Sequence, residues 1–188
     1  MLFRSKHKVE VDGKHIFTNL TKTYIAFHKP RGILSTMLDP EHRPSLQNFF
    51  GDFEERLFHV GRLDKESEGL ILLTNDGEWA HRASHPSFEI EKTYLVETKE
   101  PLSRVALQRL VSGVTLDDGF AQVSSARSYG NRTEVVIHEG RNQIVRRLFE
   151  EIGFPVLRLI RTSIGSIKLG ELPEGRWRAL NTVEVSSL

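Results

Sequence analysis

The stretch that decides the fold is Gly61-Arg62-Leu63-Asp64-Lys65-Glu66-Ser67-Glu68-Gly69-Leu70-Ile71-Leu72-Leu73. Its last four residues form an apolar run, which is typical of a buried strand. The residues before that run form a polar segment between two glycines, which predicts a tight turn leading into the strand. A turn held by a buried strand presents its side chains rigidly, so this segment is a candidate active-site loop.

Asp64 is the side chain of this turn that is best suited to chemistry. It lies beside two cations, Arg62 and Lys65, which favour the ionised form of a carboxylate. Such a carboxylate can act as a nucleophile or as a general base. The same pattern also fits an ordinary acidic turn in which Asp64 caps backbone N–H groups. The segment alone gives the two interpretations equal weight.

The rest of the chain alternates short strands with a few helices. Expected strands cover 24–28 and 57–60 before the turn, and 92–98, 114–116, 120–128, 133–138, 156–161 and 166–169 after it. Expected helices cover 77–84, a segment from Ser103 to 110 or 111, and 142–152. Because strands outnumber helices and short turns join many neighbours, the pattern predicts an α+β fold with a mixed, mostly antiparallel sheet.

Composition sets broad limits on the class of protein. The chain has 188 residues, of which 38% are hydrophobic and 27% charged, as is ordinary for a soluble protein. It has no apolar run long enough for a transmembrane helix, and residues 1–8 do not resemble a signal peptide. The absence of cysteine excludes disulfides, thiolate nucleophiles and cysteine-bound zinc, and it fits a cytoplasmic location.

Charge is segregated along the chain although the net charge is only +1. Residues 1–31 and 141–178 are rich in Lys and Arg, whereas residues 32–140 contain more acids than bases. A basic surface assembled from the two ends could neutralise phosphates. From charge alone, cations scattered over the fold and simply solvated are the favoured interpretation.

The decapeptide at 61–70 resembles the catalytic motif Gly-Arg-Leu-Asp-x-x-Ser-Glu-Gly-Leu of the RsuA/RluB family of RNA pseudouridine synthases, which modify ribosomal RNA. Three further segments resemble motifs of that family and follow in the same order. They are Lys29-Pro30-Arg31-Gly32, Glu91-Lys92-Thr93-Tyr94-Leu95-Val96, and a closing set made of 139–142, Arg146-Arg147, 157–161 and 164–165. Ordered motifs are far more specific than any one alone, and the resemblance covers about residues 22–180.

The resemblance implies a bent mixed sheet in two subdomains with flanking helices, and a central active-site cleft that contains Asp64 and Tyr94. It also implies the chemistry, which is isomerisation of a specific uridine, with no metal or organic cofactor needed. Asp64 would act at the ribose as nucleophile or general base, paired with Arg146. Tyr94 would stack on the flipped uracil and take its C5 proton, and Leu159 would form the opposite wall. Without the motif, Tyr94 and Leu159 would read as core residues.

The remaining cations of the motifs are expected to contact RNA. Arg62 and Lys65 are candidates for phosphates beside the flipped nucleotide. Lys29 and Arg31 are expected at the rim of the groove. Further basic residues that extend this set are Arg141, Arg147, Arg158 and Arg161. Because Arg146 and Arg147 are adjacent on an expected helix, only one can face Asp64, and the other is expected to meet RNA or solvent.

One segment departs from the family pattern. The family usually has Gln two residues before the Arg pair, whereas this chain has Ile144 there and Gln143 in place of an Arg. On a helix starting at Asn142, Gln143 could not occupy the face of the missing Gln. The departure puts local polar contacts in doubt, but Arg146 is intact, so activity is still expected.

Two domains and one partner class are expected. Residues 9–16 alternate around a glycine turn and predict a small hairpin. The resemblance identifies residues 1–21 as a remnant of an N-terminal RNA-binding module with a linker, and 22–188 as the catalytic domain. The expected partner is a ribosomal RNA stem-loop with a flipped uridine. Large-subunit RNA is preferred, and the RNA could be free or part of an assembling ribosomal subunit. The protein is expected to be a monomer without a membrane partner.

Three other functions compete with this one. A non-catalytic RNA-binding or ribosome-assembly protein of the same fold fits the basic ends, but it has no use for an isolated carboxylate that would repel phosphate. A glycoside hydrolase could use Asp64 and Glu68 as its carboxylate pair, although few Trp and Tyr residues are present for a sugar cleft. A metal hydrolase could use His81 and His85, but no acid is placed between them as in zinc-protease motifs.

Overall fold

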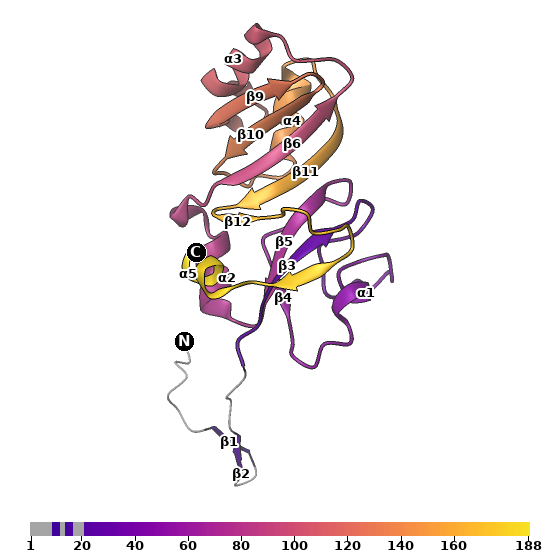
Figure 1. Cartoon of the computed structure of the whole chain (residues 1–188), viewed down its shortest axis with the longest axis vertical. Helices are drawn as coiled ribbons and strands as arrows, with labels where there is room; N and C mark the ends of the chain where they lie inside the picture. The colour runs from indigo at the N-terminus through magenta and orange to yellow at the C-terminus, as the bar shows by residue number, and fades with distance from the viewer. Residues whose placement is uncertain (1–8, 12–13, 17–20) are drawn as a thin grey trace.

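The computed structural model describes residues 9–11, 14–16 and 21–188 (Figure 1). Its strands are β1 (Val9–Val11), β2 (Lys14–Ile16), β3 (Tyr24–Lys29), β4 (Phe58–Val60), β5 (Glu68–Thr74), β6 (Lys92–Thr98), β7 (Val114–Leu116), β8 (Gly119–Ala121), β9 (Ser125–Tyr129), β10 (Arg132–Ile137), β11 (Val156–Ile164), β12 (Ile167–Lys168) and β13 (Trp177–Ala179). Its helices are α1 (Gln47–Phe50), α2 (Gly77–Ser84), α3 (Arg104–Ser112), α4 (Ile144–Glu151) and α5 (Thr182–Ser186), with a 3₁₀ turn η1 (Pro86–Phe88). No helix among the described residues is long and apolar enough to cross a membrane.

One large sheet forms the scaffold, in the strand order β13-β3-β5-β11-β6-β10-β9, with β4 paired to β5 and β12 to β11. All of its pairings are antiparallel except that of β5 with β11. The sheet therefore has the mixed, mostly antiparallel character predicted from the sequence. Figure 1 shows it divided into a β3 subdomain, with β3, β4, β5, β13, α1, α2 and α5, and a β6 subdomain, with β6, β9, β10, β11, α3 and α4.

The two subdomains are joined by a very short strand pairing. The parallel contact of β5 with β11 covers only two residue pairs, Ile160 with Glu68 and Arg161 with Gly69. Gly69 has φ +106°, and a Cβ there would lie 2.4 Å from the Arg161 carbonyl oxygen. Only glycine lets the two backbones approach this closely. The junction thus places the first residues of β5, and the Asp64 turn that precedes them, next to the middle of β11.

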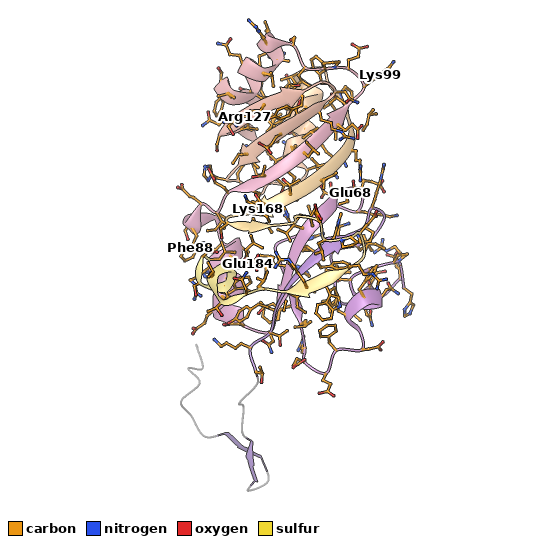
Figure 2. All side chains as sticks on the ribbon, viewed as in Figure 1. Glu68, Phe88, Lys99, Arg127, Lys168 and Glu184 are labelled. Carbon is orange, nitrogen blue, oxygen red and sulfur yellow. The ribbon has the colours of Figure 1, made fainter. Side chains whose placement is uncertain are left out.

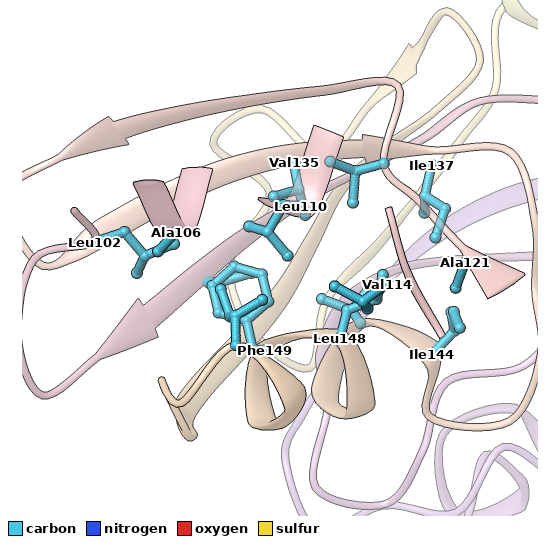
Figure 3. Close-up of a cluster of buried hydrophobic side chains, with 14 of the residues drawn as sticks. Leu102, Ala106, Leu110, Val114, Ala121, Val135, Ile137, Ile144, Leu148 and Phe149 are labelled. Carbon is cyan, nitrogen blue, oxygen red and sulfur yellow. The ribbon is translucent and has the colours of Figure 1, made fainter. Parts of the chain in front are cut away.

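Each subdomain has its own hydrophobic core. In the β6 subdomain, α3 and α4 cover one face of the sheet and bury Leu110, Leu148 and Phe149 against Val135 (Figure 3). In the β3 subdomain, β5 is buried along its whole length. Its two faces contribute to two separate clusters, one under α2 and one under α1. This explains the unbroken apolar run after the Asp64 turn, since a strand covered on both faces need not alternate.

Local sequence signals account for most element boundaries. The Asp76 carboxylate accepts hydrogen bonds from the first turn of α2, and Ser103 caps α3 as expected. The hairpin predicted at 9–16 is present as β1 paired antiparallel with β2. The linker expected at the end of residues 1–21 falls largely outside the described residues. The segment 120–128 is divided into β8 and β9, and α1, β13 and α5 were not anticipated by the sequence pattern.

Candidate active site

A cleft of about 760 Å³ lies between the Asp64 turn and the β6 subdomain. The turn contributes one part of the lining, and residues of β6 and β11, the segment before α4, and the end of α2 with the start of η1 contribute the rest. Several of the expected site residues meet here. Those that line the cleft are Arg62, Asp64, Tyr94, Arg141, Leu159 and Arg161, whereas Lys29, Arg31, Lys65, Arg146 and Arg147 do not line it.

The Asp64 turn is fixed by the segment that follows β3. The Gly32 N–H donates to the Lys65 carbonyl oxygen at 2.8 Å. The Ser35 hydroxyl donates to the Leu63 carbonyl oxygen at 2.7 Å and accepts from the Leu63 N–H at 3.1 Å. Because backbone groups on both sides of Asp64 are held, the half-buried carboxylate has a defined position at the cleft wall. The motif at 29–32 thus serves the turn at 61–70 directly.

Tyr94 and Leu159 lie on the same face of the sheet, so Leu159 does not form a wall opposite Tyr94 as expected from the sequence. In the β6–β11 ladder, Arg161 is directly opposite Tyr94 and Leu159 is directly opposite Val96. Directly opposite residues of an antiparallel pair share a face, and residues two apart on one strand do as well. Tyr94, Leu159 and Arg161 therefore project together into the cleft. Tyr94 remains half-buried and packs against both neighbouring hydrophobic cores.

The expected ion pair between Asp64 and Arg146 is not formed, which corrects the sequence prediction. Arg146 Nη2 instead donates to the Glu66 carbonyl oxygen at 2.8 Å, next to the Asp64 turn. Burial lowers the pKa of Arg146, and the negative charge of Asp64 opposes that decrease. Its Nε is buried and has no hydrogen-bond partner among the described residues. Arg146 thus stabilises the turn by a hydrogen bond to its backbone and affects Asp64 through its charge rather than by direct contact.

Lys29 does not lie at the groove rim as expected, because its side chain is 0% exposed. Its ammonium group donates to the Pro30 carbonyl oxygen at 2.9 Å and to the Ile33 carbonyl oxygen at 2.7 Å. Burial, reinforced by the charge of Arg161, lowers the pKa of Lys29 to about 8, and the charge of Asp64 partly opposes this. A neutral amine still has enough protons for both carbonyls. Lys29 therefore holds the segment that holds the Asp64 turn.

The buried Lys29 predicts a pH dependence of stability. Its pKa is about 8 in the folded protein against an ordinary 10.5, so the unfolded chain binds more protons between these values. The burial penalty is thus fully present below pH 8 and is relieved as pH rises. Between about pH 7 and about pH 9.5, the free energy of unfolding of the wild type should rise by about 2 kcal/mol relative to that of Lys29→Met. Urea unfolding at both pH values measures this, and a constant difference would contradict it.

Arg161 is also not a surface phosphate contact, since it is only 4% exposed. Its Nε donates to the Leu70 carbonyl oxygen at 2.7 Å and its Nη1 to the Arg62 carbonyl oxygen at 3.2 Å. These contacts tie β11 to the two ends of the Asp64 turn. Arg161 still lines the cleft, where its Nη2 is buried without a hydrogen-bond partner among the described residues.

Arg147 and Arg141 are held by acidic side chains rather than left free for RNA. Arg147 Nη1 donates to Asp118 at 2.8 Å, and its Nη2 pairs with Asp117 and Asp118. Arg141 pairs with Glu139 and, at 2.8 Å, with Asp118. The expectation that Arg147 and Arg146 diverge is confirmed, but Arg147 faces the β7–β8 turn instead of RNA or solvent. These pairs brace the segment that carries the cleft wall before α4.

The other expected RNA contacts fall into two groups. Arg31 is exposed and pairs with Glu66 at 2.8 Å, next to the Asp64 turn. Arg158 pairs with the buried carboxylate of Glu68. Arg62 and Lys65 are exposed, and neither forms an ion pair within the described part of the chain. Of the cations named from the sequence, Arg62 and Lys65 are therefore best placed to meet phosphate beside Asp64.

The two hydrolase alternatives lose their structural basis. Glu68 is not a cleft residue, since it is buried and neutralised by Arg158, so it cannot act together with Asp64 at a glycosidic bond. The His81 and His85 rings stack on each other with centroids 4.7 Å apart. Among the described residues, no group of three or more His, Asp or Glu side chains is arranged to hold a metal ion. The histidine pair therefore has a packing role.

Helix α4 begins later than the sequence pattern indicates. Gln143 is not helical but has φ +49°, and it is exposed at the cleft wall, while Ile144 is buried in the core. The argument that Gln143 lies on the wrong helix face is therefore wrong, because Gln143 precedes the helix. Lys92 also lines the cleft and was not singled out from the sequence. Its position two residues before Tyr94 on the same strand face is the signal that could have identified it.

Comparison with known proteins gives a consistent result. The family model described as RNA pseudouridylate synthase matches residues 23–151. A Mycobacterium tuberculosis protein named as an uncharacterised RNA pseudouridine synthase is 45% identical over 192 residues, covering 96% of this chain and 74% of the relative. The ribosomal large subunit pseudouridine synthase B of Bacillus subtilis is 36% identical over 188 residues, covering 96% and 77%. A crystal structure of a pseudouridylate synthase superposes with a TM-score of 0.81 at 31% identity, covering 92% of this chain and 76% of that one.

Proposed function

The chain belongs to the RNA pseudouridylate synthase family, and from that premise we propose that it converts one uridine, or a few, of ribosomal RNA to pseudouridine. The observation that carries the proposal is that Asp64, Tyr94 and Leu159 line one cleft, with Tyr94 and Leu159 on the same face of the sheet. The relatives include a synthase named for the large ribosomal subunit, which supports large-subunit RNA as the substrate. Nothing in the comparisons supports the non-catalytic alternative.

The proposed reaction moves the glycosidic bond from N1 to C5 of the same uracil. In one route an Asp64 oxygen bonds to C1′, and in the other Asp64 removes the 2′ proton and a C1′–C2′ double bond forms. In both routes the electron pair of the C1′–N1 bond leaves with the uracil. The ring turns and C5 bonds to C1′. In the first route this bond displaces the Asp64 oxygen from C1′, and in the second Asp64 returns the proton to C2′ as the C1′–C2′ double bond is used up. The C5 proton then passes to a base, and N1 gains a proton. No atom is gained or lost overall.

The surrounding side chains support these roles in different ways. The half-buried Tyr94 offers a flat face for an extruded base and a hydroxyl that can relay the C5 proton, accepting it while passing its own proton to solvent. The buried Leu159 offers an apolar wall. The exposed Arg62 and Lys65 can contact phosphates next to the flipped nucleotide. A base inside a stem can reach this cleft only after it is flipped out, so a stem-loop with a flipped uridine is the proposed substrate.

The proposal extends to organisation and setting. Residues 22–188 form the catalytic domain, a range that includes both subdomains of the described structure. The enzyme acts as a monomer in the cytoplasm, on free ribosomal RNA or on assembling subunits. The identification of residues 1–21 as part of an RNA-binding module stays a prediction.

Tritium release tests the proposed function, because the C5 proton is lost in every route. The enzyme is incubated with large-subunit RNA, small-subunit RNA and partly assembled particles, each containing C5-tritiated uridine. We expect release of about one equivalent, or a few, from large-subunit RNA, with pseudouridine mapped to the same number of positions. Release from the small-subunit RNA alone would show that the substrate is small-subunit and not large-subunit RNA. No release from any of the RNAs or particles would overturn the function.

A further inference from the structure

Lys92 is a cation in the cleft to which no role has yet been assigned. It lies two residues before Tyr94 on β6, so the two side chains share a sheet face. Its side chain is half-buried and lines the cleft. The ammonium group donates to the His138 carbonyl oxygen at 3.2 Å, which leaves further protons available for a ligand.

Arg161 provides a second positive charge on the same face. It is directly opposite Tyr94 across the β6–β11 ladder. Backbone carbonyls satisfy its Nε and Nη1, whereas the buried Nη2 has no partner among the described residues. A buried guanidinium nitrogen without an acceptor is unfavourable. Because protein atoms cover this nitrogen, Arg161 acts on an anion in the cleft through its positive charge and not through a direct hydrogen bond.

These two cations interact unfavourably in the absence of a ligand. Burial and the charge of Arg161 together lower the pKa of Lys92. Neither Lys92 nor Arg161 forms an ion pair with a carboxylate in the part of the chain that the structure describes. Two like charges brought together beside an aromatic ring favour an anionic partner. The arrangement thus fits a group that is negatively charged when it occupies the space next to Tyr94.

We propose that Lys92 is a catalytic residue that, together with Arg161, stabilises the negative charge that develops on the uracil ring when the C1′–N1 bond breaks. The inference rests on the proposed function and deepens it. When the electron pair of that bond stays on the uracil, the ring becomes an anion whose charge is shared by N1 and its carbonyl oxygens. This holds for both routes open to Asp64. Fixed donors aimed at a developing oxyanion act most strongly in a partly desolvated site.

Lys92→Gln tests this inference on the RNA that the wild type modifies. We expect the single-turnover rate at saturating RNA to fall about 100-fold, because one positioned charged donor is lost. RNA affinity and its dependence on salt should stay as in the wild type. Lys92→Arg, which keeps the charge, should recover at least about tenfold of the lost rate. Lys99→Gln is the matched control, since Lys99 is exposed just beyond the other end of β6 (Figure 2), and it should react like the wild type.

Other outcomes would overturn the inference. If Lys92 contacts a backbone phosphate, Lys92→Gln will weaken RNA binding and reduce its salt dependence, while the rate at saturation stays unchanged. If Lys92 only supports the fold, both Lys92 variants will lose thermal stability and rate together, without recovery in Lys92→Arg. If the wild type is active and either of these two results is obtained, only this inference is overturned. A wild type that forms no pseudouridine overturns it together with the proposed function.

Discussion

Asp64→Asn should abolish pseudouridine formation while RNA binding is retained. Asparagine has nearly the same shape, so the turn held by Gly32 and Ser35 can keep its conformation. It can neither attack C1′ nor remove the 2′ proton. Loss of a reacting group of this kind lowers the rate by about 10⁴-fold or more. Tritium release and pseudouridine mapping under single-turnover conditions measure the loss.

RNA affinity distinguishes this chemical role from a binding role. A carboxylate in the cleft repels phosphate, so Asp64→Asn should bind RNA as tightly as the wild type or more tightly. Asp52→Asn is a suitable control, because Asp52 is exposed and lies outside the cleft. It should react like the wild type. Residual activity of Asp64→Asn within tenfold of the wild type would show that another group performs the chemistry.

The same substitution should also be detectable away from the reaction. The charge of Asp64 raises the pKa of Lys29, against the effects of burial and Arg161. Without that charge, the pKa of Lys29 should fall further below its ordinary value. A titration of the Lys29 Cε resonance by NMR in wild type and Asp64→Asn would show the shift. It would also confirm that the variant is folded and that the Asp64 turn still lies over Lys29.

Much of the fold follows from local sequence signals. The apolar run from Leu70 to Leu73 predicts a buried strand, and β5 is buried along its whole length. Ser103 and Gly113 bound α3 as expected. The failures are short elements: α1, β13 and α5 span only four, three and five residues, too few for a periodicity to show. β13 exists because it pairs with β3, which is distant in the sequence, so no local pattern could reveal it.

The position of the active-site loop was predictable, but the roles of most cations were not. The motifs correctly bring Asp64, Tyr94 and Leu159 to one cleft. The fate of several arginines depends on acids distant in the sequence, such as Asp118 for Arg147. This pairing also accounts for the charge segregation, since bases near the end of the chain are neutralised by acids from its middle. Burial of a charged side chain depends on tertiary contacts that a linear pattern does not contain.

Gly69→Ala should be strongly damaging, because among the described glycines Gly69 is the one whose added Cβ would lie nearest to backbone atoms. The new Cβ would lie 2.4 Å from the Arg161 carbonyl oxygen and 2.6 Å from its nitrogen. These are backbone atoms of β11, so no side chain can rotate away to make room. The φ of +106° adds a strain that alanine does not tolerate. The short β5–β11 pairing must therefore separate or shift.

Gly69→Ala should lower both the stability and the activity of the protein. We expect the free energy of unfolding to fall by about 3 kcal/mol or more, measured by urea unfolding followed by circular dichroism. Gly130→Ala is the matched control, because Gly130 also has a positive φ but no atom would lie within 4 Å of its Cβ. It should cost only about 1 kcal/mol. Equal losses in the two variants would show that backbone strain, and not the close approach of β11, makes Gly69 necessary.

The activity of Gly69→Ala then tests how the cleft is held together. Arg161 reaches from β11 to the Leu70 and Arg62 carbonyl oxygens, one on each side of Asp64. A shift of β11 away from β5 lengthens both contacts and moves Tyr94, its neighbour in the ladder, relative to the carboxylate. Misplacement of reacting groups by about 1 Å can cost about 100-fold in rate. We therefore expect the folded fraction of Gly69→Ala to lose at least that much, whereas Gly130→Ala keeps full activity.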